Sequence, residues 1–253
     1  MSEVLLTENR DGVLAVTLNR PEKRNAIDIP MWESIRDTFR AAAEDDSVTC
    51  LLLSGAGDNF CSGVDLSAFS DGSDGEHPFE AAARAVAGFD KPIVAAAQGA
   101  AVGGGATILF HADILYIGES FRLRLPFASL ALVPEWASSY MLQANIGAQR
   151  AAELFYTAEW VDADKAISYD MAAAVLPDAD LLAHAEAKAR EIAQWPVSSL
   201  REIKRCLRMH HTEAIDAAFK AEQAAMVRQA GSPDNIEAVM AFMEKREPNF
   251  RRD

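Results

Sequence analysis

The stretch Gly99-Ala100-Ala101-Val102-Gly103-Gly104-Gly105-Ala106 contains three consecutive glycines between two other recognisable segments. The run Ile93–Ala97 before it has the length and composition of a buried strand, and the stretch Thr107 to Phe110 follows it. Glycines that lead from a strand into a helix leave backbone N–H groups free and allow a ligand to approach closely. The stretch therefore predicts either a site for an oxygen that develops negative charge or a turn that only permits tight packing. It lacks the G-x-G-x-x-G spacing of a dinucleotide site.

Short apolar or alternating runs recur through the first half of the chain and are bounded by Gly, Asp or Pro. They are typical of strands and comprise Val13–Leu18, Val48–Leu53, Ile93–Ala97, Ile114–Ile117 and Phe121–Leu125. A spacing of four residues indicates a helix with one buried face, formed by Ile27, Met31, Ile35 and Phe39. Strands that alternate with helices favour βαβ units with mostly parallel pairing, so we expect an α/β fold.

From Asp178 onward the pattern is helical throughout. Apolar residues mark two helices there, the first with Ile215, Phe219 and Met226 and the second with Ile236, Val239, Met240 and Met243. We therefore divide the chain into a core of residues 1–195 and a helical C-terminal region of residues 196–253. The polar segment Ser67 to Pro78 is rich in turn-forming residues and predicts a mobile surface loop.

The composition restricts the classes of partner. Half of the 253 residues are hydrophobic, which is enough for a large buried core. The formal net charge of −14 repels phosphates, so nucleic acid and anionic membranes are unfavourable partners, and an anionic ligand needs a local basic cluster. The three cysteines, Cys50, Cys61 and Cys206, are too few and too far apart for a disulfide framework or a zinc site. No histidine has a metal-binding spacing either, so we expect reduced thiols and no metal.

The sequence also predicts a cytoplasmic location. Residues Met1 to Gly12 show no basic stretch followed by an apolar run, as a signal peptide requires. The longest apolar stretches fall short of the ~20 residues that span a bilayer. The last residues, Arg251-Arg252-Asp253, are not a peroxisomal address.

A second motif, Phe60-Cys61-Ser62-Gly63-Val64-Asp65-Leu66, follows the run Val48–Leu53. Alone it is typical of an ordinary loop. The pair F-x-S-G-x-D-L and G-x-x-x-G-G-G, about forty residues apart, resembles the crotonase superfamily, which is the enoyl-CoA hydratase/isomerase family. The resemblance extends to the segments Asn19 to Ala26, Ala112 to Ile114 and Glu244 to Phe250.

The resemblance implies a spiral of ββα units with a helical C-terminal trimerisation region, and hence a homotrimer or a dimer of trimers. It implies that the backbone N–H groups of Val64 and Gly104 bind the oxygen of an acyl-CoA thioester and stabilise its enolate. Coenzyme A enters as part of the substrate, and no separate cofactor is implied. The other positions expected to contact the substrate are Lys23, Arg24, Ala26, Ser62, Asp65, Leu66, Gly103, Thr107, Phe127, Trp136 and Phe250. Lys23 and Arg24 are candidates for the phosphates or form a solvated basic turn, and Phe250 contacts the nucleotide or only follows a helix end.

The chain departs from the hydratases of this superfamily at both of their catalytic glutamates. The resemblance places Thr107 and Phe127 at those positions. Adding water to a double bond requires a group that orients and deprotonates the water, and neither Thr nor Phe does this. Ordinary hydratase activity is therefore not expected.

Glu135 offers a different carboxylate. The segment Leu132 to Tyr140 resembles the P-E-G-x-S-S segment of Δ3,Δ2-enoyl-CoA isomerases, whose glutamate lies eight residues beyond the second hydratase position, as Glu135 does beyond Phe127. One carboxylate suffices to remove a proton at C2 and return it at C4. Its apolar neighbours predict a raised pKa. Trp136 replaces a glycine of these isomerases, which implies a short or unusually shaped acyl group or a lost activity.

Three alternatives stay open on the sequence. Glu135 is a catalytic base or a solvated loop acid. The protein is an isomerase, or a non-catalytic acyl-CoA-binding homologue that kept the glycine-rich site and lost the base. A third alternative is another reaction of the superfamily, such as a decarboxylation or ring chemistry.

Overall fold

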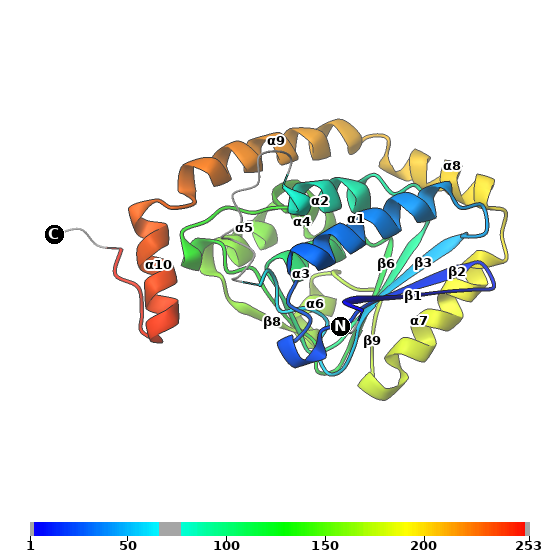
Figure 1. Ribbon diagram of the computed structural model, residues 1–253, viewed down its shortest axis with the longest axis horizontal. Helices are drawn as coiled ribbons and strands as arrows, with labels where there is room; N and C mark the ends of the chain where they lie inside the picture. Colours follow the sequence, from blue (N-terminus) through cyan, green and yellow to red (C-terminus); the bar gives the residue numbers. More distant parts are fainter. Residues whose placement is uncertain (1–2, 66–76, 251–253) are drawn as a thin grey trace.

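The computed structural model describes residues 3–65 and 77–250 and contains a six-stranded sheet in the order β1-β2-β3-β4-β6-β9 (Figure 1). Its strands are β1 (Leu5–Arg10), β2 (Val13–Leu18), β3 (Cys50–Gly55), β4 (Ile93–Ala97), β6 (Ile114–Gly118) and β9 (Ala174–Leu176). Only the β1–β2 pair in this sheet is antiparallel, and the other pairs are parallel. Parallel neighbours need long crossover connections, which here contain helices.

Both faces of this sheet are buried. Successive side chains of a strand point to opposite faces, so Leu51 and Leu53 of β3 join one hydrophobic cluster and Cys50 and Leu52 join the other. The first cluster includes residues of α1 (Ile29–Glu44) and α2 (Pro78–Ala87), and the second includes residues of α7 (Asp178–Ala193). Figure 1 shows α7 on the opposite side of the sheet from α1 and α2. Burial on both faces explains why these strands read as nearly continuous apolar runs.

A second, three-stranded sheet lies beside the first. It has the order β5-β7-β8 and comprises β5 (Ala100–Val102), β7 (Arg122–Arg124) and β8 (Trp160–Asp162). β4 and β5 are separated only by Gln98 and Gly99, so the chain passes directly from the large sheet to the small one. The glycine-rich stretch then enters α3 (Gly104–Thr107) and the 3-10 helix η3 (Ile108–His111). The junction of the two sheets thus positions the glycines.

The remaining helices surround this core. They are the 3-10 helices η1 (Pro21–Lys23) and η4 (Ala128–Leu130) and the α-helices α4 (Ser138–Ile146), α5 (Ala148–Thr157), α6 (Ala163–Ser168), α8 (Val197–Arg208), α9 (Thr212–Gln229) and α10 (Pro233–Glu244). α9 packs against α4, and α10 contacts η4 at the end of the molecule away from the large sheet (Figure 1). No helix in the described part of the chain is both long and apolar enough to cross a membrane.

The expected α/β class, the strands Val13–Leu18 and Ile93–Ala97 and the helical region from Asp178 onward are confirmed. The helix assignment was wrong at Ile27, which is buried but lies before the start of α1. The helix begins after Asp28, because the Asp28 carboxylate caps it by accepting a hydrogen bond from the Met31 N–H at 3.1 Å. The division at residues 195 and 196 stays a prediction.

The expected loop Ser67 to Pro78 lies outside the described residues except at its end, where Pro78 is the first residue of α2. His210 is exposed, but His211 is half-buried and its Nδ1 lies 2.7 Å from the Tyr140 hydroxyl. That contact joins the start of α9 to α4.

Candidate active site

The glycines at the start of α3 allow two chain segments to touch. Gly103 caps α3 with a φ of 52°, in the left-handed region that glycine adopts without steric cost. A Cβ placed on Gly105 would lie 2.5 Å from the Cys61 carbonyl oxygen and 2.6 Å from Cys61 Sγ. Only glycine at position 105 therefore lets the Cys61 segment pack directly on the start of α3. This close packing brings Val64 to Gly104.

Val64 has a backbone N–H that its pairing with Ile27 does not use. A bridge joins it to Ile27, in which the Ile27 N–H donates to the Gly63 carbonyl and the Asp65 N–H donates to the Ile27 carbonyl, both at 2.9 Å. These bonds use the neighbours of Val64, so its own N–H points away from Ile27. Val64 Cγ2 is 3.5 Å from the position that a Cβ would take on Gly104. Within residues 3–65 and 77–250, neither the Val64 N–H nor the Gly104 N–H donates to a backbone carbonyl.

Asn25 and Arg20 fix the loop that contains Val64 through contacts of their side chains. The side chain of Asn25 is fully buried and donates from Nδ2 to the carbonyls of Ala56 and Asn59 at 2.9 and 2.8 Å. The Arg20 guanidinium lies 3.1 Å from the Asp65 carboxylate, directly after Val64. Asp65, which was expected to contact the substrate, thus has a charged protein partner. These bonds fix the direction of the Val64 N–H.

The basic turn lies beside the same loop. Lys23 and Arg24 are exposed, and their carbonyl oxygens accept hydrogen bonds from the Ser62 hydroxyl at 3.3 Å and the Ser62 N–H at 2.9 Å, respectively. Ala26, also expected near the substrate, is half-buried and donates its N–H to the Lys23 carbonyl at 3.0 Å. The structure thus places two solvated cations within a few residues of Val64, on a chain whose net charge is strongly negative.

Glu135 faces the glycines. Its Oε1 lies 3.0 Å from the position that a Cβ would take on Gly104, and the residue is half-buried. Burial of the carboxyl, together with the charge of Glu222, raises the pKa of Glu135 to about 8. No described residue donates a hydrogen bond to this carboxylate that would stabilise its charged form. The structure therefore brings a strong carboxylate base to the two free N–H groups.

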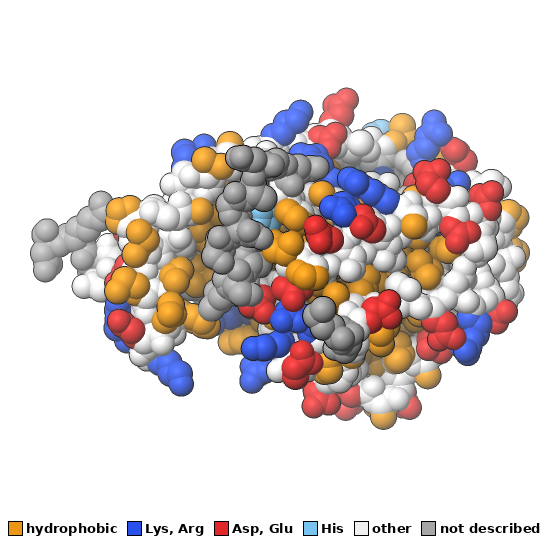
Figure 2. All heavy atoms as spheres, viewed as in Figure 1, with side chains coloured by type: hydrophobic (Ala, Val, Ile, Leu, Met, Phe, Trp, Pro, Cys, Tyr) orange, Lys and Arg blue, Asp and Glu red, His pale blue; other side chains and the backbone are white. Residues whose placement is uncertain are grey.

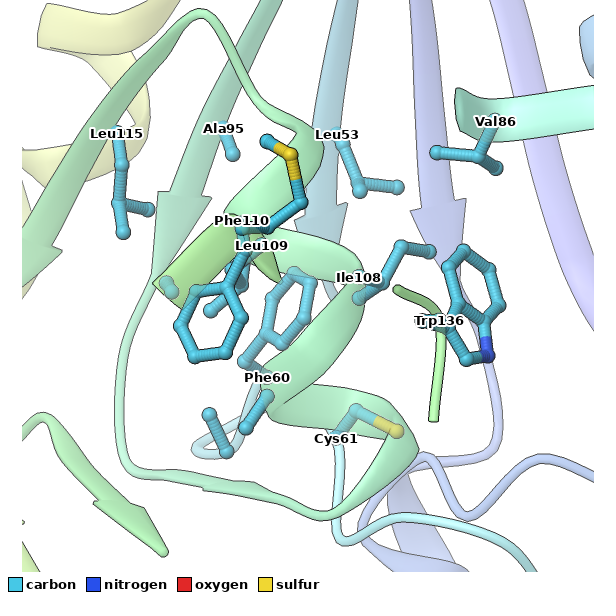
Figure 3. Packing of buried hydrophobic residues seen from close by; sticks show 14 of the residues in the cluster. Leu53, Phe60, Cys61, Val86, Ala95, Ile108, Leu109, Phe110, Leu115 and Trp136 are labelled. Atoms are coloured by element: carbon cyan, nitrogen blue, oxygen red, sulfur yellow. The ribbon is translucent and has the colours of Figure 1, made fainter. Parts of the chain in front are cut away.

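Trp136 occupies the core and not open pocket space. Its side chain is 1% exposed, and its φ of 61° is the left-handed value that glycine favours. The backbone carbonyl of Trp136 lies 2.7 Å from His111 Nε2. Burial lowers the pKa of His111 to about 4, so the imidazole is neutral at pH 7, and its Nε2–H donates to this carbonyl. In Figure 3 the indole stands beside Ile108 in the same buried cluster as Phe60 and Cys61.

An aromatic wall borders the carboxylate. The ring centroids of Trp136 lie 5.7 Å from Trp32 and 6.1 Å from Phe79, and Trp32 and Phe79 are 5.2 Å apart. Trp32 also comes within 3.5 Å of the Cβ position on Gly104. We define Trp32, Phe79 and Trp136 as the aromatic wall. Trp32 of this wall and Glu135 Oε1 thus approach the same point, the Cβ position on Gly104.

The two positions at which the resemblance places the hydratase glutamates hold no acid. Thr107 is buried and its hydroxyl is 3.4 Å from the Gly104 carbonyl, and buried Phe127 packs against Phe155 with ring centroids 6.1 Å apart. Neither side chain exchanges protons at neutral pH. Of the other expected contacts, Phe250 is 41% exposed beyond α10, and Leu66 lies outside the described residues.

Sequence reasoning missed Trp32, Asn25 and Glu222 as parts of this site. Trp32 is adjacent to Met31 among the buried residues of α1, and the spacing of four that predicted this helix does not include it. Asn25 was quoted within a motif without a role. Glu222 lies 87 residues after Glu135 on a helix of mixed polarity, and nothing in its local pattern shows that it is buried. Only the three-dimensional packing of α9 on α4 brings it to the site.

Comparison with known proteins agrees with this geometry. The family model described as "Enoyl-CoA hydratase/isomerase" matches residues 8–253. The chain is 30% identical to 1,2-epoxyphenylacetyl-CoA isomerase of Escherichia coli, with 99% of both chains covered. It is 32% identical to enoyl-CoA hydratase EchA19 of Mycobacterium tuberculosis, over 97% of this chain and 96% of that one. A crystal structure of an enoyl-CoA hydratase/isomerase from Pseudoalteromonas atlantica matches with a TM-score of 0.95 and 33% identity, over 98% of this chain and 100% of that chain.

The expected crotonase-type fold is thereby confirmed. The names of relatives at similar identity include hydratases and isomerases, so they do not select one reaction. The choice between reactions has to come from the side chains at the site.

Proposed function

The chain belongs to the enoyl-CoA hydratase/isomerase family, and we propose that it moves the double bond of a 3-enoyl-CoA to C2 with Glu135 as the single acid and base. As a member of this family it is a crotonase-type enzyme of acyl-CoA thioesters. One observation carries the choice of reaction. Glu135 brings a carboxylate next to Gly104, with Oε1 3.0 Å from the Gly104 Cβ position, while Thr107 and Phe127 stand where the resemblance places the hydratase glutamates.

The proposed reaction uses one proton twice. The thioester oxygen accepts hydrogen bonds from the N–H groups of Val64 and Gly104, and the Glu135 carboxylate removes a proton from C2. The electron pair moves onto the thioester oxygen as an enolate, which the two donors stabilise by about 3 kcal/mol each in comparable sites. Protonated Glu135 then gives the proton to C4, and the double bond ends between C2 and C3. No oxidant, metal or water is consumed, so the proposal requires no cofactor.

The rest of the substrate has candidate partners near this centre. Lys23 and Arg24 lie beside the loop that carries Val64, where they are available to the phosphates of coenzyme A as charge-assisted donors. The aromatic wall limits the acyl group near C2 to C4. We therefore propose a short or flat acyl group, in line with the tryptophan at position 136.

The rate should depend on pH through Glu135. The base is the carboxylate, and its pKa is raised to about 8, so the active form becomes populated as the pH rises through about 8. We expect kcat/KM, which reports the ionisation of the unliganded protein, to increase between pH 6 and about 9 and then to level off. A rate that stays constant over this range would show that the ionisation of Glu135 does not control the chemical step.

A substrate panel tests the proposed reaction. Short 3-enoyl-CoA and 2-enoyl-CoA thioesters are supplied separately, and the products are separated by chromatography. We expect conversion of the 3-enoyl-CoA and, because two carboxylates are missing, hydration of the 2-enoyl-CoA at least about 10²-fold slower. Fast hydration would overturn the proposal. Binding of both thioesters without turnover would instead favour the non-catalytic homologue.

We also propose that the chain forms a trimer or a dimer of trimers through its C-terminal helices. α10 exposes a set of apolar side chains, Ile236, Val239, Met240, Phe242 and Met243, and Figure 2 shows hydrophobic side chains gathered over this helix. Such a surface is unusual on a monomer.

Light scattering tests this assembly. The parent protein is expected at three or six times the chain mass of 27.4 kDa. Met243→Glu, which charges the most exposed of these side chains, should lower the mass. Leu182 is an exposed apolar residue of α7, which lies far from α10 (Figure 1), so Leu182→Glu is the matched control and should leave the mass unchanged. A monomeric parent at micromolar concentration would contradict the proposal.

A further inference from the structure

We propose that Glu222 of α9 is a positioning residue for the reaction, because its carboxylate fixes the backbone that carries Glu135 and places a second negative charge within electrostatic range of that base. The inference rests on the proposed role of Glu135. Glu222 does not touch the reacting atoms and acts only through Glu135.

The carboxylate of Glu222 spans two backbone donors of the catalytic segment. Its Oε2 accepts the Ala137 N–H at 2.7 Å, and its Oε1 accepts the Ser139 N–H at 2.8 Å. Glu222 is 7% exposed, so water does not compete strongly for these bonds. A carboxylate with one donor on each oxygen is held in a single orientation. Both donors lie within four residues of Glu135.

These bonds fall where the local sequence provides no support. α4 begins at Ser138, and its N-cap, Ala137, has no side chain that caps the helix. Trp136 and Ala137 are consecutive non-glycine residues with φ of 61° and 52°, a conformation that L-residues avoid. The Ser138 N–H returns to the Glu135 carbonyl at 3.0 Å. Glu222 thus supplies from another helix the cap that α4 lacks, and it holds the turn that aims Glu135 at Gly104.

The electrostatic part of the proposal depends on the groups around both acids. Burial first, and then the charge of Glu222, raises the pKa of Glu135. Burial raises the pKa of Glu222, while its bonds to Ser139 and Ala137 act in the opposite direction. The Cys61 thiol and the neutral His111 imidazole adjoin the segment without adding a positive charge.

The other titratable and charged groups near Glu222 lie on α9 and on the helices packed against it. His211 binds the Tyr140 hydroxyl on α4, and Arg84 of α2 lies over the Phe219 ring one turn before Glu222 and faces Asp216 at 3.9 Å. No described residue forms an ion pair with Glu222 or with Glu135. The charge of Glu222 therefore raises the proton affinity of Glu135, and we expect the titration of Glu135 to depend on the charge of Glu222.

Two variants separate charge from positioning. Glu222→Gln keeps the size of the side chain and removes the charge, so the pKa of Glu135 should fall by about one pH unit and the pH–rate midpoint should fall with it. Its amide oxygen can accept only one of the two backbone N–H groups, so kcat should fall as well, and the midpoint is the readout that isolates the charge. Glu222→Asp keeps the charge but is too short to reach both N–H groups, so the midpoint should stay near that of the parent while kcat falls. Glu213→Gln is the matched control, since it removes one exposed acid from the same helix.

The titration is read directly, so that it does not depend on turnover. Protein with 13C-labelled glutamate side chains is titrated by NMR, and the Glu135 carboxyl resonance is the one that disappears in Glu135→Gln. We expect the midpoint of this resonance to be lower in Glu222→Gln and unchanged in Glu213→Gln. An equal midpoint in folded Glu222→Gln and parent protein, or an equal shift in Glu213→Gln, would overturn the proposal. If the shift occurs in a protein that does not isomerise 3-enoyl-CoA, the proposed function fails and the coupling of the two acids stands.

Discussion

Replacing Glu135 by Gln is expected to lower the turnover of 3-enoyl-CoA by about 10²–10⁴-fold and to leave acyl-CoA affinity nearly unchanged. The amide has the shape of the carboxylate but cannot accept the C2 proton. The donors that hold the thioester oxygen, the N–H groups of Val64 and Gly104, are backbone groups and are not altered. Turnover is measured with a short 3-enoyl-CoA, and affinity is measured by calorimetry with a non-reactive acyl-CoA.

Thr107→Ala is the control for this experiment. Thr107 is buried beside the glycines and stands at a position that holds a glutamate in the hydratases, so its substitution tests whether any change at the site has the same effect. We expect it to change turnover far less than Glu135→Gln. A Glu135→Gln variant that isomerises the thioester as fast as the parent would remove Glu135 from the mechanism.

Gly105→Ala is expected to lower the free energy of unfolding by about 2–4 kcal/mol and to abolish most activity. The new methyl group would lie 2.5 Å from the Cys61 carbonyl oxygen and 2.6 Å from its Sγ. Cys61 cannot retreat easily, because its N–H donates to the Ala100 carbonyl and its carbonyl accepts the Val102 N–H, both at 3.0 Å. The strain should separate the Val64 segment from Gly104. Urea unfolding and the isomerase assay measure the two effects.

Gly88→Ala provides the comparison. Gly88 has a φ of −86°, and an added Cβ would meet only the Arg84 carbonyl at 3.1 Å, at the end of α2. We expect a change below about 1 kcal/mol there. If both variants are equally stable, or if Gly105→Ala retains full activity, the close contact between Cys61 and α3 does not assemble the site.

The sequence predicted the parts of the fold that are buried on both faces. The runs at Val13 and Ile93 are central strands, and their apolar composition is visible without a structure. The edge strand β1 was missed because only Leu5 of its six residues is buried, so no alternation shows. β5, β8 and β9 have three residues each, which is too short for a periodic pattern. The start of α1 was misplaced because Ile27 continues the spacing of four although it forms a bridge with Val64.

The candidate site was predictable where it depends on local motifs. The backbone conformation of the glycines at 103–105 and of the segment before Val64 is predictable from the residue types in those segments. Glu135 was found through resemblance, and its raised pKa followed from apolar neighbours. The supporting residues were not predictable in this way. Asn25 and Glu222 act on backbone groups 31 to 85 residues away, and no local pattern encodes such contacts.

Isotope transfer from C2 to C4 shows whether Glu135 carries the proton between these two carbons. A 3-enoyl-CoA that carries deuterium at C2 is incubated with the parent protein in ordinary water, and the product is analysed by mass spectrometry and NMR. With Glu135 as the only proton carrier above the Val64 and Gly104 donors, 2-enoyl-CoA should form, and part of the label lost from C2 should appear at C4. No product and no loss of label from C2 would mean that the bound thioester never forms an enolate and that Glu135 is not its base.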